Sequence, residues 1–90
     1  MAKRGRLEII QNILGIIQKN QNSINITPLL RRTNISSTRF KEYYLELKEK
    51  ELIKETKSQN GEKSISLTQK GFMFLEKYKT IISFIEEFDL

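Results

Sequence analysis

The spacing of apolar residues changes twice along this chain of 90 residues. Before residue 51, apolar side chains recur every three or four positions, which is the period of an amphipathic helix. Residues 52–57 and 63–67 are strand-like instead, and the second segment alternates cleanly. Helical spacing returns over residues 69–87. No repeat or linker interrupts this order, so we expect one domain with helices, two strands and a last helix.

The first predicted helix covers residues 5–19. Residues 20–23, Asn-Gln-Asn-Ser, favour a turn that ends this helix, and a short β-like stretch follows at 24–26. The apolar residues of this helix that should face the core are Leu7, Ile10, Ile13, Leu14 and Ile17.

Two further helices are predicted, separated by a short turn. Thr27 suits the capping position of the first of them, and Pro28 suits its first helical position, where a missing N–H costs nothing. That helix should end near Thr33, with Asn34 in the left-handed conformation, and Ser36 can cap the next helix. A short helix, a turn and a longer helix make a helix–turn–helix unit. In such a unit the first helix braces the second, whose exposed face can enter the major groove of DNA.

A tight hairpin is expected between the two strands. Asn60 and Gly61 form the dipeptide that best suits a two-residue type I′ turn. Thr68 then caps the last helix. The predicted fold class is α+β, mostly α, with three helices, a β-hairpin and a long C-terminal helix.

The chain contains neither cysteine nor histidine. Disulfides, thiolate nucleophiles, haem ligation and zinc ligation are therefore excluded. No carboxylate pair converges at a Gly-rich loop, so we expect no enzyme activity, no metal and no cofactor, and no small-molecule ligand is evident. The uncharged runs are too short to span a bilayer, and polar residues break the apolar stretch that a secretory signal would need. We expect a soluble, cytoplasmic protein.

Basic residues gather in the first half of the chain. The formal net charge is +5, of which residues 1–48 contribute +6 and residues 49–90 contribute −1. A cation-rich half beside a balanced half favours a surface that binds a polyanion, although lysines that only keep the chain soluble would give a similar count.

The third predicted helix offers candidate contacts to duplex DNA. With Phe40, Tyr44 and Leu47 as its inward stripe, a step of ~100° per residue turns other residues, among them Thr38 and Lys41, outward. Hydroxyl groups can bond a phosphate or a base edge, and a lysine can bond guanine or phosphate. Over the whole chain, the expected DNA contacts are Arg4, Arg6, Arg32, Ser37, Thr38, Arg39, Lys41, Lys57, Asn60 and Lys63.

Several outward residues have a second interpretation. Arg32 also suits the negative end of the dipole of its helix. Lys57 and Lys63 on the hairpin also discourage edge-to-edge pairing of strands. The basic N-terminal arm either lies along phosphates or does nothing specific. Glu42 either accepts from cytosine or is an ordinary surface acid, and Leu45 either touches a thymine methyl group or packs on a neighbouring element.

The last helix carries more apolar surface than a domain of this size needs. One face can close the core, and pairing with the same helix of a second copy would bury the remainder. Four residues widen the apolar surface beyond the predicted seam, namely Phe74, Ile81, Phe84 and Phe88. The residues expected in that homodimer interface are Leu75, Tyr78, Ile82, Ile85 and Phe88.

Several short motifs occur together along the chain, and the segment 67–71, Leu-Thr-Gln-Lys-Gly, is the most specific of them. The others are residues 3–10, 34–36, Tyr43, Tyr44, Leu47, Leu52, Ile53 and Leu75. Over nearly its whole length the chain resembles the small archaeal winged helix–turn–helix proteins, which are predicted transcriptional regulators or chromatin-like DNA binders. Members of that family are dimers joined through the C-terminal helix. The resemblance therefore implies a DNA-binding part at 1–67 and a dimerisation helix at 68–90 within one domain.

One position departs from that family. Glycine usually stands just before the Leu52-Ile53 pair, where a helix ends in the left-handed conformation, and this chain has Glu51 there. Glutamate in that geometry costs about 1 kcal/mol. Otherwise the helix ends differently and the angle of the hairpin changes.

These observations predict a homodimer that binds double-stranded DNA as a transcriptional regulator or as a chromatin-type protein of the nucleoid. The alternative is a module that docks on a larger protein assembly, since a fold does not by itself determine a function. The charge asymmetry favours DNA.

Overall fold

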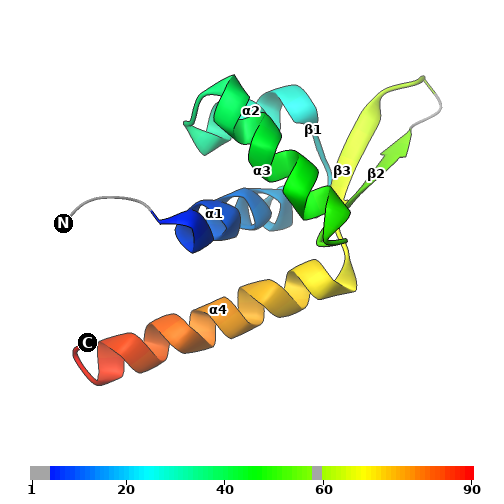
Figure 1. The fold of residues 1–90 in the computed structure, drawn as a ribbon. Coiled ribbons are helices and arrows are strands. Elements are labelled where there is room, and N and C mark those ends of the chain that lie inside the picture. The colour runs from blue at the N-terminus through cyan, green and yellow to red at the C-terminus, as the bar shows by residue number, and fades with distance from the viewer. Residues whose placement is uncertain (1–4, 58–59) are drawn as a thin grey trace.

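The computed structural model describes residues 5–57 and 60–90, and Figure 1 shows how their elements are arranged. In chain order these are α1 (Arg6–Lys19), β1 (Ile24–Asn25), α2 (Ile26–Thr33), α3 (Ser37–Glu49), β2 (Ile53–Lys57), β3 (Lys63–Leu67) and α4 (Gln69–Glu87). The first three helices lie beside an antiparallel sheet with the strand order β1–β3–β2, and α4 runs back along α1 (Figure 1). The predicted fold class is confirmed.

The sheet ties the early part of the chain to the hairpin. β1 pairs with β3, so that Ile24 lies opposite Ile65, and β2 pairs with the other edge of β3. The side chain of Asn22, in the turn after α1, accepts a hydrogen bond from the backbone N–H of Leu67 at 2.7 Å. The stretch predicted only as β-like therefore provides a third strand.

Helix α1 supplies a large share of the core. Leu7 was predicted to be in this core, but it is 55% exposed. It lies in the first turn of α1, at the end that points away from the sheet (Figure 1), and the core does not extend that far. The helical period shows which face is apolar but not where the core ends, so this prediction was wrong. The buried residues of α1 are Ile9, Ile10, Ile13, Leu14 and Ile17.

Helix α2 begins earlier than predicted. Its N-cap is Asn25, whose side chain makes no capping hydrogen bond, and Ile26 is already helical. Thr27 is therefore not the cap. Because β1 ends at Asn25, the chain passes from the sheet directly into the helix. Pro28 becomes the third helical residue, which still lies in the first turn, where a backbone N–H has no helical partner.

The pairing register of the hairpin differs from the one that the predicted two-residue turn would give. A two-residue turn at Asn60 and Gly61 would place Lys57 opposite Ser64. In the structure Lys57 lies opposite Lys63 instead, which is a shift of one residue in the register. The type I′ prediction was wrong because the register of a strand follows from burial of its core-facing side chains, and this outweighs the preference of one dipeptide.

The turn after α3 keeps the left-handed geometry at Glu51, whose φ is 61°. The N–H of Glu51 donates to the carbonyl of Lys48 at 3.0 Å, and the N–H of Leu52 donates to the carbonyl of Leu47 at 2.9 Å. These two bonds form a Schellman motif, and the apolar contact that usually accompanies it is available from Leu47 and Leu52, which are both buried. A glutamate thus stands where a glycine is favoured.

The motif at 67–71 packs against that same turn. Thr68 caps α4 by accepting from the N–H of Gly71 at 3.1 Å, and its hydroxyl donates to the carbonyl of Glu51 at 2.6 Å. A Cβ on Gly71 would lie 2.3 Å from the carbonyl oxygen of Leu52. Only glycine allows α4 to approach the turn this closely.

Candidate nucleic-acid interface

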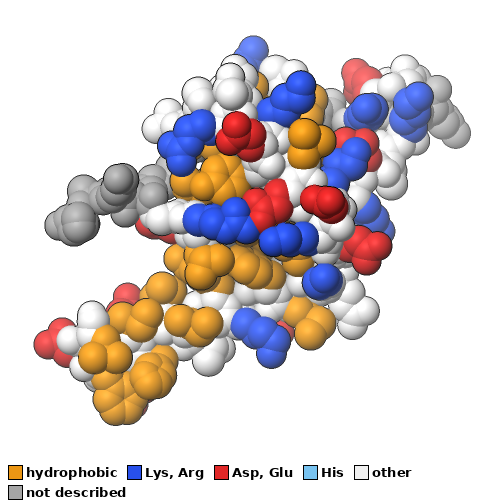
Figure 2. Space-filling model, viewed as in Figure 1, with side chains coloured by type: hydrophobic (Ala, Val, Ile, Leu, Met, Phe, Trp, Pro, Cys, Tyr) orange, Lys and Arg blue, Asp and Glu red, His pale blue; other side chains and the backbone are white. Residues whose placement is uncertain are grey.

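Helix α3 presents a polar face to the solvent. Phe40, Tyr44 and Leu47 are buried in the core, as the helical period predicted. Figure 2 shows Lys and Arg side chains over α3 and the hairpin, with acidic side chains between them. The four residues predicted to face outward from α3 are exposed, namely Thr38, Lys41, Glu42 and Leu45. Ser37 and Arg39, the other DNA contacts predicted on α3, are exposed as well.

The orientation of α3 is set by α2 and by the turn between the two helices. Asn34 closes α2 with a φ of 62°, in the left-handed region as predicted. Ser36 caps α3 by accepting from the backbone N–H of Arg39 at 3.2 Å. Thr33 is buried, and its hydroxyl donates to the carbonyl of Leu30 at 2.7 Å. These contacts define a helix–turn–helix unit.

Arg32 lies at the C-terminal end of α2 and is exposed. Its Nη1 donates to Oδ1 of Asn20 in the turn after α1, at 3.0 Å. A guanidinium has five N–H donors, so this bond leaves others for a phosphate.

The hairpin is tied to α3 through Glu55. The hydroxyl of Tyr44 donates to the Glu55 carboxylate, and the Nζ atoms of Lys48 and Lys63 lie 3.3 and 3.9 Å from its Oε1. The hydrogen bond from Tyr44, together with Lys48, lowers the pKa of Glu55. Burial and the bond to Glu55 raise the pKa of Tyr44. Both shifts keep a carboxylate and a protonated phenol in contact at neutral pH.

The sequence analysis did not predict a role for Glu55, although its position in the strand indicated that it faces the core side of the sheet. Glu55 follows the buried Ile53 by two positions, so both share one face of β2. The three hairpin residues predicted at the DNA, Lys57, Asn60 and Lys63, are exposed.

Arg6 is not part of an extended arm, because it is the first residue of α1. Its guanidinium forms a two-point ion pair with Glu46 of α3, in which Nη1 lies 2.7 Å from Oε1 and Nη2 bonds Oε2. Lys50 also bonds Glu46, at 2.9 Å. The hydrogen bonds from Arg6 and then Lys50 lower the pKa of Glu46 to about 2. Arg4 lies outside the described residues.

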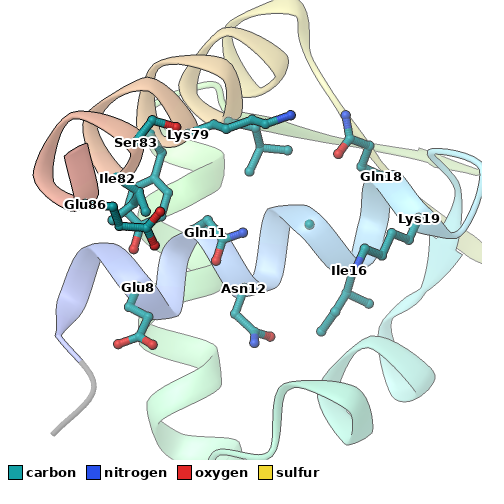
Figure 3. A pocket seen from close by; sticks show the side chains of 13 residues that line it. Glu8, Gln11, Asn12, Ile16, Gln18, Lys19, Lys79, Ile82, Ser83 and Glu86 are labelled. Atoms are coloured by element: carbon teal, nitrogen blue, oxygen red, sulfur yellow. The ribbon is translucent and has the colours of Figure 1, made fainter. Parts of the chain in front are cut away.

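A groove of about 680 Å³ lies between α1 and α4. Figure 3 shows Gln11 and Ile16 of α1 on one side of it and Ile82 and Glu86 of α4 on the other. Asn12 also lines the groove, and its Oδ1 is buried without a hydrogen-bond partner among the described residues.

The five residues predicted in a dimer interface differ in their surroundings. Leu75 packs against the core of its own chain. Tyr78 and Ile82 line the groove between α1 and α4. Ile85 and Phe88 are exposed.

The exposed apolar surface is concentrated toward the end of α4. Ile81, Phe84 and Phe88 are 55%, 48% and 61% exposed. Figure 2 shows apolar side chains gathered at the C-terminal end of α4, whose place in the same view is given by Figure 1. The outer apolar face of α4 therefore includes Ile81 and Phe84, which were predicted only to widen the apolar surface beyond the dimer seam.

Within residues 5–57 and 60–90 no group of three acidic, histidine or cysteine side chains is placed to hold a metal ion. None of the helices in those ranges is long and apolar enough to cross a membrane.

A bracing helix, a helix with an exposed polar face and a β-hairpin directly after it define a winged helix–turn–helix protein. The chain belongs to the winged helix-turn-helix family whose sequence model matches residues 3–86. A search of the curated proteins found no match.

Solved structures share this fold. Sso10a-2, a DNA-binding protein from Sulfolobus solfataricus, is 20% identical, with 94% of this chain and 85% of that chain covered and a TM-score of 0.74. A winged-helix DNA-binding protein from STIV is 20% identical, with 89% and 91% covered and a TM-score of 0.73. MepR, a transcription regulator of a Staphylococcus aureus efflux pump, is 19% identical, with 88% and 59% covered and a TM-score of 0.76.

Proposed function

We propose that this protein binds double-stranded DNA as a homodimer and acts as a transcriptional regulator or a chromatin-type protein of the nucleoid. The observation that carries the proposal is the exposed face of α3, where hydroxyl and cationic side chains lie beside a lysine-bearing hairpin. The DNA-binding and regulatory names of the structural neighbours support it.

In this proposal α3 enters the major groove and the hairpin follows the backbone. Ser37 and Thr38 lie in the first turn of α3, where hydroxyl groups and free backbone N–H groups suit a phosphate. Arg39 and Lys41 supply positive charge, and Lys41 also suits the O6 and N7 atoms of guanine. Lys57 and Lys63 contact phosphates from the hairpin.

Fluorescence anisotropy with a labelled duplex tests the DNA contacts. Between about 50 and 200 mM salt the affinity should fall steeply, because bound cations release counterions from the DNA. The Arg39→Ala/Lys41→Ala variant should bind more weakly and lower the salt slope by about 2, one for each lost phosphate contact. A Lys70→Ala/Lys77→Ala variant loses the same charge from α4 and should match the parent.

Two outcomes contradict the DNA proposal. Equal loss of affinity in the two double variants removes α3 from the interface. Absence of any duplex binding at low salt favours the protein-docking alternative, for which the exposed apolar end of α4 provides a surface.

The same apolar end supports the homodimer. Side chains such as Phe84 and Ile81 expose contiguous apolar surface that association with a second copy would cover. Light scattering should give twice the chain mass for the parent and one chain mass for Ile81→Ser/Phe84→Ser. Met73→Ser, which changes an exposed apolar residue at the other end of α4, should remain a dimer. A monomeric parent at micromolar concentration overturns this part.

A further inference from the structure

A second groove, of about 440 Å³, lies between α2, α3 and the hairpin. Its apolar wall is formed by Ile26 and Leu30 of α2 and by Phe40 and Leu45 of α3. Leu45 is 53% exposed and Ile26 is 39% exposed. Lys41, a proposed DNA contact, also lines this groove. Contacts to phosphates do not need an apolar wall, so the DNA backbone does not account for it.

The remainder of the groove is cationic. Lys41, Lys48 and Lys63 line it together with a single carboxylate, that of Glu55. Lys48 and Lys63 share Glu55, while Lys41 makes no ion pair with any residue that the structure describes. Glu55 is already the acceptor of the Tyr44 hydroxyl. Three lysines against one carboxylate give the lining of the groove a net charge of +2.

We propose that this groove binds a small amphiphilic organic anion, a carboxylate with a short aliphatic or aromatic body, and that the bound anion excludes DNA. The body lies against Leu30 and Leu45, and the carboxylate lies at Lys41, where charge-assisted hydrogen bonds hold it. The volume falls within the range of about 300–1,000 Å³ that small-molecule sites occupy.

Competition with DNA follows from shared cations. Lys41 and Lys63 line the groove and are also proposed DNA contacts, so they cannot serve a carboxylate and a phosphate together. This regulatory part rests on the proposed function, whereas binding of the anion does not.

Octanoate titrated into the isotopically labelled protein without DNA tests the site by nuclear magnetic resonance. Saturable shifts are expected at the amides of Ile26, Lys41 and Leu45. Octylamine has a similar alkyl chain and the opposite charge and should not saturate this site, and neutral octanamide should bind more weakly than octanoate.

Point variants separate the cationic and apolar parts of the site. Lys41→Ala should weaken octanoate binding about threefold, as expected for one exposed ion pair. Leu45→Ala should weaken it by a similar factor, since about half of the leucine side chain is available for contact. The matched controls are Lys77→Ala for charge and Leu7→Ala for an equally exposed leucine on α1, and both should bind octanoate as the parent does.

The DNA titration is then repeated with octanoate present. At an octanoate concentration ten times the dissociation constant of octanoate itself, the apparent Kd for the duplex should rise about tenfold. The proposal is overturned if octanoate does not saturate, if octylamine binds equally well, or if the shifts lie only on α4. Unchanged duplex affinity at saturating octanoate overturns the exclusion of DNA. If no duplex is bound at all, the proposed function fails, and the titration without DNA still decides whether the groove takes the anion.

Discussion

Replacing Glu51 with glycine should stabilise this protein. Glu51 adopts a φ of 61° in the Schellman motif that ends α3. An L-residue in this conformation brings its Cβ close to the following carbonyl oxygen, and glycine has no Cβ. The side chain of Glu51 is exposed and makes no hydrogen bond or ion pair with any described residue, so its removal costs no visible contact.

The expected gain follows from two opposing terms. Relief of the left-handed strain contributes about 1–2 kcal/mol to the free energy of unfolding. The greater freedom of glycine in the unfolded chain removes about 0.5–1 kcal/mol of that gain. The net gain of about 0.5–1 kcal/mol should raise the Tm of a domain of this size by roughly 2–8 °C.

Thermal unfolding followed by circular dichroism measures this change at one protein concentration, because association would make the Tm concentration-dependent. Glu49→Gly is the matched control. It removes the same side chain from the last residue of α3, where φ is not positive, and should lower stability by about 0.5–1 kcal/mol. If both variants are destabilised, or if Glu51→Gly leaves the Tm unchanged, the assigned strain is wrong.

Three further predictions follow from contacts in the fold. Gly71→Ala forces a Cβ to within 2.3 Å of the carbonyl oxygen of Leu52, and urea denaturation should show a loss of at least about 1–3 kcal/mol. Ser36→Ala removes the cap of α3 and should lower the free energy of unfolding by about 1 kcal/mol in the same assay. Ser36→Asp still offers a capping oxygen and should retain most of the stability of the parent. The Glu46 carboxylate has its pKa lowered from 4.5 to about 2 by Arg6, so its stabilising effect is complete above pH 4.5 and is lost as the pH falls toward 2. Unfolding measured across this range should show a smaller loss of stability in Glu46→Gln than in the parent, and parallel curves would contradict the assigned ion pair.

Much of the fold was predictable because its signals lie in neighbouring residues. A helical period over a few turns predicts α1, α3 and α4 without reference to anything distant. Ser36 and Thr68 cap the residues that immediately follow them, and Asn34 tolerates the left-handed conformation through its own backbone preference. The outward face of α3 followed from its inward face by simple geometry.

For the candidate sites, the sequence predicted the chemical character of a surface but not all of the residues that form it. The sequence indicated a cationic outer face on α3, and Lys41 lies there. It also indicated an excess of apolar surface on α4, but not which part is used within the chain. Leu75 packs on its own core, whereas Phe84 remains exposed, and only the packing of α4 on the rest of the chain makes this division.

What the sequence determined by itself was the order of helices and strands, the caps of α3 and α4 and the left-handed end of α2, since each depends on residues a few positions apart. The tertiary structure decided which distant groups meet. Arg6 reaches Glu46 across 40 positions, and Tyr44 reaches Glu55 on the hairpin. Burial of strand side chains, rather than the Asn60-Gly61 preference, set the hairpin register. These outcomes depend on the packing of whole elements, whose combined burial outweighs the preference of any single residue.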